Sequence, residues 1–223
     1  MRPTTHRLEL FINLPGQGRQ RALALASITP AELVDAVLQE FRGELEYLSD
    51  SVADYRLVRA ADHPPLDDGA ADHAPLDDGA PLAAQVTDGD DLALEERPRE
   101  VPQGARPLSK PVYLREQATG MVFRLAWLPA IIGRPDDNLP DNEMLAVNLA
   151  PLVSGARVSR RHAQIVEDGG QLFVESLARQ NPTIVRAAAG NETRVEDGRV
   201  PLSDGDVIYL ERSKLALKVI VRE

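Results

Sequence analysis

Basic, hydroxyl and amide side chains recur at three points in the C-terminal half of the chain, each beside a short apolar run. Arg134 follows one such run, and Ser159 and Arg160 precede another. Asn181 lies between two more. A planar guanidinium fork, together with hydroxyl and amide donors, is the set of groups that best holds a phosphate. The pattern therefore predicts an anion-binding site on loops at strand ends, where a rigid scaffold presents such side chains.

The elements that would position these side chains are short strands separated by turns. Asp-Gly turns are expected at Asp168-Gly169, Asp197-Gly198 and Asp204-Gly205, and no convincing helix intervenes. Many short strands at this spacing predict an all-β sandwich. The expected strands cover residues 111–115, 121–125, 130–132, 163–166, 172–175, 183–185, 207–210 and 215–221.

Composition restricts the classes of protein. The chain has 223 residues, 43% of them hydrophobic and 27% charged, so it can fill one or two packed domains. It contains no cysteine, which excludes a disulfide framework, a thiolate metal site and a cysteine nucleophile. No apolar run reaches the roughly 18 residues of a membrane helix, and the N-terminus does not resemble a signal peptide. We expect a soluble cytoplasmic protein that does not insert into a membrane.

The net charge of −10 is unevenly distributed. Residues 1–110 carry 11 basic and 20 acidic side chains, whereas residues 111–223 carry 14 and 15. A strongly acidic segment is a poor ligand for a phosphate backbone, so nucleic acid is not an expected partner. Residues 98–110 contain three prolines and Gly104, which predicts an extended linker between one domain at 1–97 and another at 111–223.

The order and spacing of the motifs in residues 111–223 resemble the forkhead-associated (FHA) domain, an all-β sandwich. The resemblance implies that Arg134 and Ser159 contact the phosphate of a phosphothreonine, and that Arg160 lines the same pocket. Asn181 would hydrogen-bond the peptide backbone. The motifs are Ile132-Gly133-Arg134, Ser159 with His162 and Ala163, Asn181 with Thr183, and Leu202 with Asp204-Gly205-Asp206.

Four further residues would support the pocket. The resemblance implies that Gly133 and His162 maintain the shape of the loops, and that Gln180 and Thr183 flank Asn181. The third loop departs from the family pattern, because Pro182 stands where glycine is common and fixes φ. This departure bears on peptide specificity.

The first segment predicts a hairpin, a helix and later strands. Leu8, Leu10 and Ile12 alternate along one strand face, and Leu23 and Leu25 are in phase along the next strand. A helix should begin at Thr29, with Pro30 in its first turn and Glu32 as capping-box partner.

This order of elements over residues 6–96 resembles ubiquitin-like β-grasp folds, most nearly the YukD/EsaB proteins of type VII secretion. No Gly-Gly tail follows Leu94, so we expect a fixed interaction module. Its apolar β-face and acidic loop would select a basic or mixed partner, whose identity the sequence does not give.

Two other kinds of chemistry are less favoured. Ser159 and His162 could be a nucleophile and base, but no acidic residue has a place as their orienter, so we expect no enzyme. His63 and His73 lie in a ten-residue duplication within residues 60–79, so the pair is one observation, and we expect neither a metal nor a cofactor.

The sequence thus predicts a bacterial adaptor in Ser/Thr kinase signalling that binds a phosphothreonine protein, with a link to a type VII-like secretion system. The alternative is a structural assembly subunit whose FHA domain docks a partner independently of phosphorylation.

Overall fold

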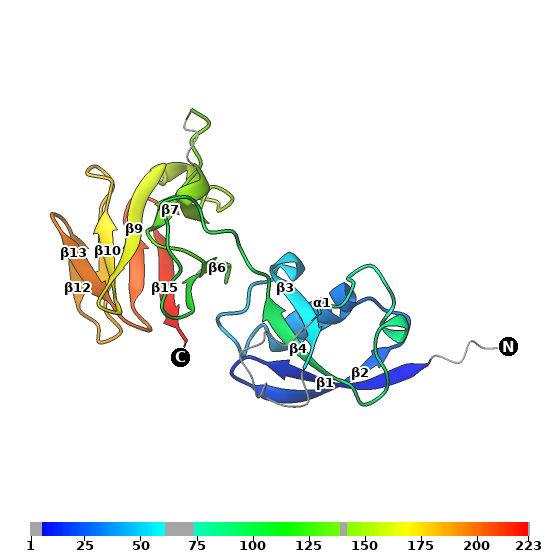
Figure 1. Ribbon diagram of the computed structural model, residues 1–223. Coiled ribbons are helices and arrows are strands. Elements are labelled where there is room, and N and C mark those ends of the chain that lie inside the picture. The colour runs from blue at the N-terminus through cyan, green and yellow to red at the C-terminus, as the bar shows by residue number, and fades with distance from the viewer. Residues whose placement is uncertain (1–5, 61–73, 139–141, 223) are drawn as a thin grey trace. The chain divides into compact units, whose positions relative to one another are not determined.

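A computed structural model describes residues 6–60, 74–138 and 142–222 (Figure 1). The chain divides into two compact units. The first comprises residues 1–44 with 50–98, and the second comprises residues 45–49 with 99–223. Most of the duplicated segment, including His63 and His73, lies outside the described residues.

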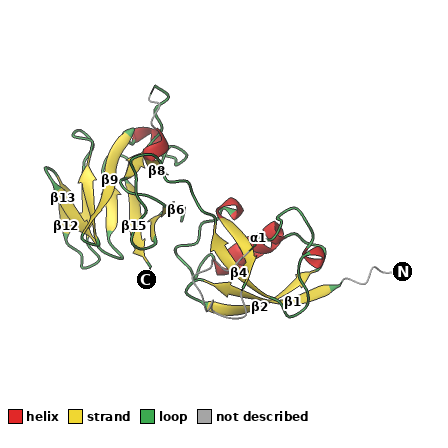
Figure 2. Cartoon of the chain, in the orientation of Figure 1, coloured by secondary structure: helices red, strands yellow, loops and turns green. Residues whose placement is uncertain are grey.

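The first unit is a four-stranded sheet with one α-helix (Figure 2). The sheet has the order β2-β1-β4-β3, in which β1 pairs antiparallel with β2 and parallel with β4. Leu8, Leu10 and Ile12 are buried on one face, which confirms the predicted alternation. The elements are β1 (Arg7–Leu14), β2 (Gly18–Leu25), α1 (Pro30–Phe41), β3 (Tyr55–Arg59) and β4 (Asp91–Glu96), with 3-10 turns at Val52–Asp54 and Leu82–Ala84.

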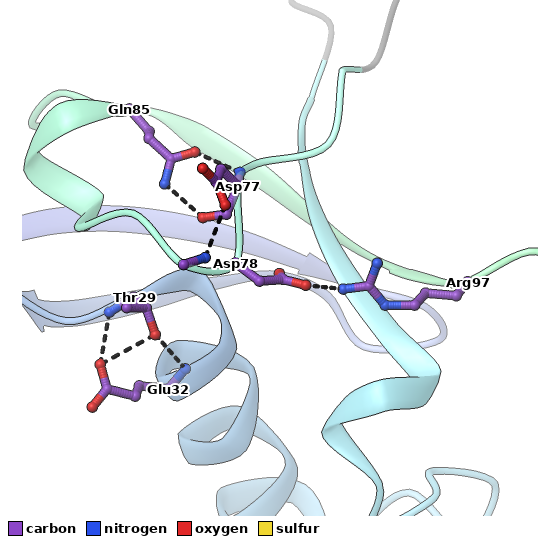
Figure 3. A network of polar contacts seen from close by, with 7 residues as sticks. Thr29, Glu32, Asp77, Asp78, Gln85 and Arg97 are labelled. Carbon is purple, nitrogen blue, oxygen red and sulfur yellow. Dashed lines mark hydrogen bonds and ion pairs between the residues drawn. The ribbon is translucent and has the colours of Figure 1, made fainter.

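Helix α1 begins as the sequence predicts. The Thr29 hydroxyl accepts from the Glu32 N–H at 3.3 Å, and the Glu32 carboxylate accepts from the Thr29 N–H at 2.8 Å (Figure 3). This reciprocal pair satisfies two N–H groups that the first turn leaves without partners. Nearby, the Gln85 amide bonds both the N–H and the C=O of Asp77, which fixes the loop that leads to β4 (Figure 3).

The exposed face of this sheet differs from the prediction. Leu23 and Leu25 lie on the outer face, with Leu23 59% exposed, because the register places Ala22 and Ala24 opposite Leu10 and Leu8. The face is not apolar but is crossed by arginine–carboxylate pairs. These pairs are Arg21–Glu9 at 2.9 Å, Arg19–Asp91 at 2.6 Å and Arg56–Glu95 at 2.9 Å.

The second unit contains a β-sandwich. The C-terminal all-β architecture is as predicted, with one sheet ordered β13-β10-β9-β7-β8 and the other β12-β11-β14-β15-β5-β6. The strands are β5 (Val112–Glu116), β6 (Val122–Leu125), β7 (Ala130–Gly133), β8 (Leu145–Asn148), β9 (Arg161–Asp168), β10 (Gln171–Ser176), β11 (Thr183–Arg186), β12 (Glu192–Val195), β13 (Arg199–Leu202), β14 (Val207–Leu210) and β15 (Leu215–Val221).

The sandwich core consists of aliphatic residues from both sheets. Ile132, Ile165 and Val174 come from one sheet, and Ile208 and Leu217 come from the other; all five are fully buried. Three strands, β8, β12 and β13, are missing from the sequence-based prediction. β12 and β13 are mostly exposed and carry charged residues or a proline where the predicted strands have apolar runs.

Two features of other functional classes are absent from the described part of the chain. Among residues 6–60, 74–138 and 142–222, no helix is long and apolar enough to cross a membrane. The same residues contain no group of three or more histidine and carboxylate side chains arranged to hold a metal ion.

The capping box gives a test of the first unit. We expect Thr29→Ala to lower the free energy of unfolding by about 1 kcal/mol, because it leaves the Glu32 N–H without its acceptor. Thr29→Ser keeps the hydroxyl and should change stability little. Denaturant unfolding of the full chain measures both variants, and equal losses would contradict the capping role.

Candidate functional site

The ends of β7, β9 and β11 bring the three predicted motifs together. β7 pairs with β9, and its register places Gly133 opposite Arg161, so Arg134 leaves the sheet beside the segment that leads into β9. The loop between β10 and β11 crosses from one sheet to the other and carries Asn181. The three motifs therefore meet at one end of the sandwich, on loops as expected.

The backbone at Gly133 lies very close to the backbone of Ser159 and Arg160. A Cβ atom at this position would lie 2.1 Å from the Arg160 carbonyl oxygen and 2.9 Å from that of Ser159. Only glycine leaves space for these backbones to meet, because real Cβ contacts are never so short. The approach lets the Arg134 N–H donate to the Arg160 carbonyl at 3.2 Å, and it gives Gly133 the supporting role that the resemblance implied.

Asn181 holds the hydroxyl of Ser159. Its Nδ2 donates to Ser159 Oγ at 2.8 Å and to the Arg157 carbonyl at 3.3 Å, and its Oδ1 is buried with no hydrogen bond among the described residues. A serine hydroxyl that accepts one bond still has its own proton to donate. Asn181 therefore presents Ser159 as a donor, while its predicted contact with a peptide backbone stays a prediction.

His162 holds the loops from the interior of the sandwich. It is 1% exposed, and its Nδ1 accepts from the Ser159 N–H at 3.4 Å, while its carbonyl accepts from the Leu177 N–H at 2.9 Å. Burial lowers the pKa of His162 to about 4, and the backbone carbonyl of Pro182 opposes this shift only in part. The ring is thus neutral, and because Nδ1 accepts, its proton lies on Nε2.

These contacts argue against a serine nucleophile. His162 binds the backbone N–H of Ser159 and not its hydroxyl, whose partner is the Asn181 amide. A general base must lie within hydrogen-bonding distance of the proton that it removes. The predicted pocket role of Ser159 is compatible with this arrangement.

Arg134 and Arg160 line one small cavity of about 10 Å³, together with Asp136, Asn142 and Arg161. The Arg134 Nε donates to the Val158 carbonyl at 3.0 Å, which orients its guanidinium group. Arg160 extends to the buried carboxylate of Asp136, with 3.3 Å between Nη1 and Oδ2. The predicted arginines therefore share a site, and an acid that the sequence did not single out lies between them.

The other predicted residues flank the site. Thr183 is fully buried at the start of β11, and Gln180 is exposed in the preceding loop. Gly155 was missed: a Cβ there would lie 2.1 Å from the Leu149 carbonyl, so the loop before Ser159 can close only over glycine. The sequence signal for Asp136 is merely its position two residues after Arg134, because nothing local indicates that its side chain is buried.

The fold and the site define a class of protein: a β-sandwich whose strand-end loops place Arg134 and Arg160 in one cavity and Asn181 against Ser159, which does not line that cavity. Residues 131–211 match the family model described as the FHA domain. The C-terminal region is therefore an FHA domain. No curated protein matches the chain closely enough to count as a relative.

Several solved structures are similar to part of the chain. Mycobacterium tuberculosis EmbR in complex with a low affinity phosphopeptide is 27% identical over 50% of this chain and 24% of that chain, with a TM-score of 0.38. The FhaA FHA domain complexed with the intracellular domain of Rv3910 is 30% identical over 48% and 98%, with a TM-score of 0.33. The FHA domain of human APLF with an XRCC1 bisphospho peptide is 23% identical over 49% and 97%, with a TM-score of 0.35.

The close approach at Gly133 gives a second test. We expect Gly133→Ala to lower the free energy of unfolding by roughly 2 kcal/mol or more, because the added methyl group overlaps a backbone carbonyl that cannot retreat. Gly43→Ala is the control, since nothing lies within 4 Å of a Cβ there. Thermal unfolding of both variants checks this, and equal stability would show that the two backbones are not tightly packed.

A third test uses the pKa of His162. Its contribution to stability is fully present above pH 6.5 and is lost as the pH falls toward 4, because the unfolded chain takes up a proton that the folded chain refuses. The expected slope in this window is at most about 1.4 kcal/mol per pH unit. An NMR titration of the His162 ring should show a midpoint near pH 4, and a midpoint near 6.5 would contradict the burial of the ring. His162→Asn should reduce the dependence of the free energy of unfolding on pH in this window.

Proposed function

We propose that this protein is a phosphothreonine-dependent adaptor in bacterial Ser/Thr kinase signalling. The observation that carries the proposal is that Arg134 and Arg160 line one cavity and that Ser159 directly precedes Arg160, within the residues that match the FHA family. An FHA domain is an interaction module, and capture of phosphorylated peptides by arginine clusters is a general mode of recognition.

The donors of the site suit a phosphate. Ser159 keeps a proton to donate because Asn181 occupies its acceptor side. The Nε of Arg134 donates to the Val158 carbonyl, and the side chain makes no other hydrogen bond to the described residues. Its two Nη groups are therefore available to a ligand. Charge-assisted bonds from guanidinium and hydroxyl groups are about twice as strong as neutral ones.

The first unit is proposed to be a ubiquitin-like β-grasp domain. The support is its topology, in which the first and last strands, β1 and β4, are parallel neighbours in the centre of the sheet and α1 lies between β2 and β3 in the chain. The ion pairs across its outer face suit a partner surface of mixed charge. A cytoplasmic location and a link to a type VII-like secretion system are parts of the same proposal.

Peptide binding gives a fourth test. We expect a phosphothreonine peptide library to contain ligands of the full chain, and Arg134→Ala or Ser159→Ala to weaken their binding roughly 10- to 100-fold, the loss of one charge-assisted contact. Arg199→Ala is the matched control, since Arg199 pairs with Asp168 at the other end of β9. Fluorescence anisotropy measures all four proteins.

The alternative function predicts a different result. If the FHA domain docks an unphosphorylated partner, co-purification should survive both phosphatase treatment and Ser159→Ala. If, in addition, no peptide from the library requires Arg134 for binding, the protein would be a structural assembly subunit and not a phosphothreonine-dependent adaptor.

A further inference from the structure

The cavity between the arginines contains one acid. Asp136 is 7% exposed, and its carboxylate lies in the same cavity as Arg134, Arg160 and Arg161. A buried carboxylate is unusual unless a cation pairs with it, and Arg160 supplies that cation at 3.3 Å. The acid therefore shares a cavity with the two arginines of the proposed phosphate site.

Asp136 is held firmly in place. Its Oδ1 accepts from the Asn138 N–H at 3.1 Å, and Asn142 bonds both the N–H and the C=O of Asp136, at 3.1 and 3.0 Å. Asp136 is thereby bonded to both Asn138 and Asn142, and its other carboxylate oxygen, Oδ2, is directed at Arg160. The side chain that can move is Arg160, which is half exposed.

The space between these groups is too small for a phosphate. A volume of about 10 Å³ corresponds to roughly one water molecule. A phosphoryl group must therefore draw Arg160 away from Asp136, or share its guanidinium with that carboxylate. In either case the ligand competes with an anion that is already bound to the arginine.

The geometry decides which effect of Asp136 dominates. The ion pair of Arg160 with Asp136, with 3.3 Å between Nη1 and Oδ2, orients a guanidinium only weakly compared with a short bidentate pair. The full negative charge of the carboxylate remains, and like charges placed close together repel a second anion. Asp136 should thus hinder anion binding more than it helps by orienting Arg160.

We propose that Asp136 is an internal counter-anion of the phosphate pocket. A ligand binds only if its attraction to Arg160 exceeds that of the Asp136 carboxylate. This inference rests on the proposed function, whose site it refines. A phosphate with nearly two charges displaces Asp136 from Arg160, whereas a single carboxylate, as in a peptide with glutamate in place of phosphothreonine, only exchanges one carboxylate for another. Asp136 therefore sets a minimum strength of anion binding, which a phosphate exceeds and a single carboxylate does not.

The test compares two neighbouring acids. Asp136→Asn removes the charge but keeps an oxygen to accept from the Asn138 N–H, so the loop should persist. We expect it to bind inorganic phosphate, and any phosphothreonine ligand of the wild type, on the order of five- to tenfold more tightly. Binding of the glutamate peptide should become measurable. Asp137→Asn is the control, because Asp137 is exposed and makes the same change in net charge.

Each outcome of this comparison is informative. Weaker phosphate binding by Asp136→Asn would show that Asp136 chiefly orients Arg160. Equal effects of Asp136→Asn and Asp137→Asn would show that only the net charge of the protein matters. Either result overturns the inference. If Asp136→Asn does not fold, the carboxyl ¹³C resonance of Asp136 in the wild type should still move when inorganic phosphate is added, while that of Asp137 stays. No movement would also overturn it.

A different result would contradict the proposed function. Absence of any phosphothreonine ligand for the wild type would contradict the adaptor, whereas the two inorganic phosphate measurements would still decide the role of Asp136.

Discussion

The geometry of the candidate site depends on how closely the end of β7 approaches the start of β9. Because Gly133 has no Cβ atom, the Arg160 carbonyl oxygen can lie close to it. A Cβ atom at this position would be only 2.1 Å from that oxygen. Because the two backbones touch, Arg134 and Arg160 leave from adjacent points of different loops and line one cavity. A larger residue would push the loops apart and separate the two guanidinium groups, although neither arginine itself would have changed.

Several of the contacts that hold these loops together are made by neutral groups. His162 stays neutral because burial lowers its pKa, and it joins the loop of Ser159 to that of Leu177 through hydrogen bonds that carry no net charge. The Asn181 amide makes a third neutral connection. Such bonds define a geometry without offering a competing anion or cation.

The sequence predicted what depends on local pattern. The alternation of Leu8, Leu10 and Ile12 indicated a buried strand face, and the resemblance to the FHA domain implied that Arg134 and Ser159 lie in one pocket. A period of two cannot say which face is buried, and the register with β1 exposed Leu23. The burial of Asp136 was equally hidden, because it follows from the bonds of Asn142 across a loop and not from any neighbour in the sequence.

Net charge is a poor guide to anion binding in this chain, because what matters is which arginines lack a carboxylate. In the first unit Arg19 and Arg21 each form close pairs with an acid, so they offer little to a ligand. Among the described residues of the FHA domain, the Arg134 side chain makes one hydrogen bond, from Nε to the Val158 carbonyl. Arg160 lies between these cases, since it pairs with the buried acid Asp136 at 3.3 Å, a longer distance than in the pairs of Arg19 and Arg21. Under the proposal for Asp136, this one pair sets the affinity of the pocket for an anion, whatever the charge of the rest of the molecule.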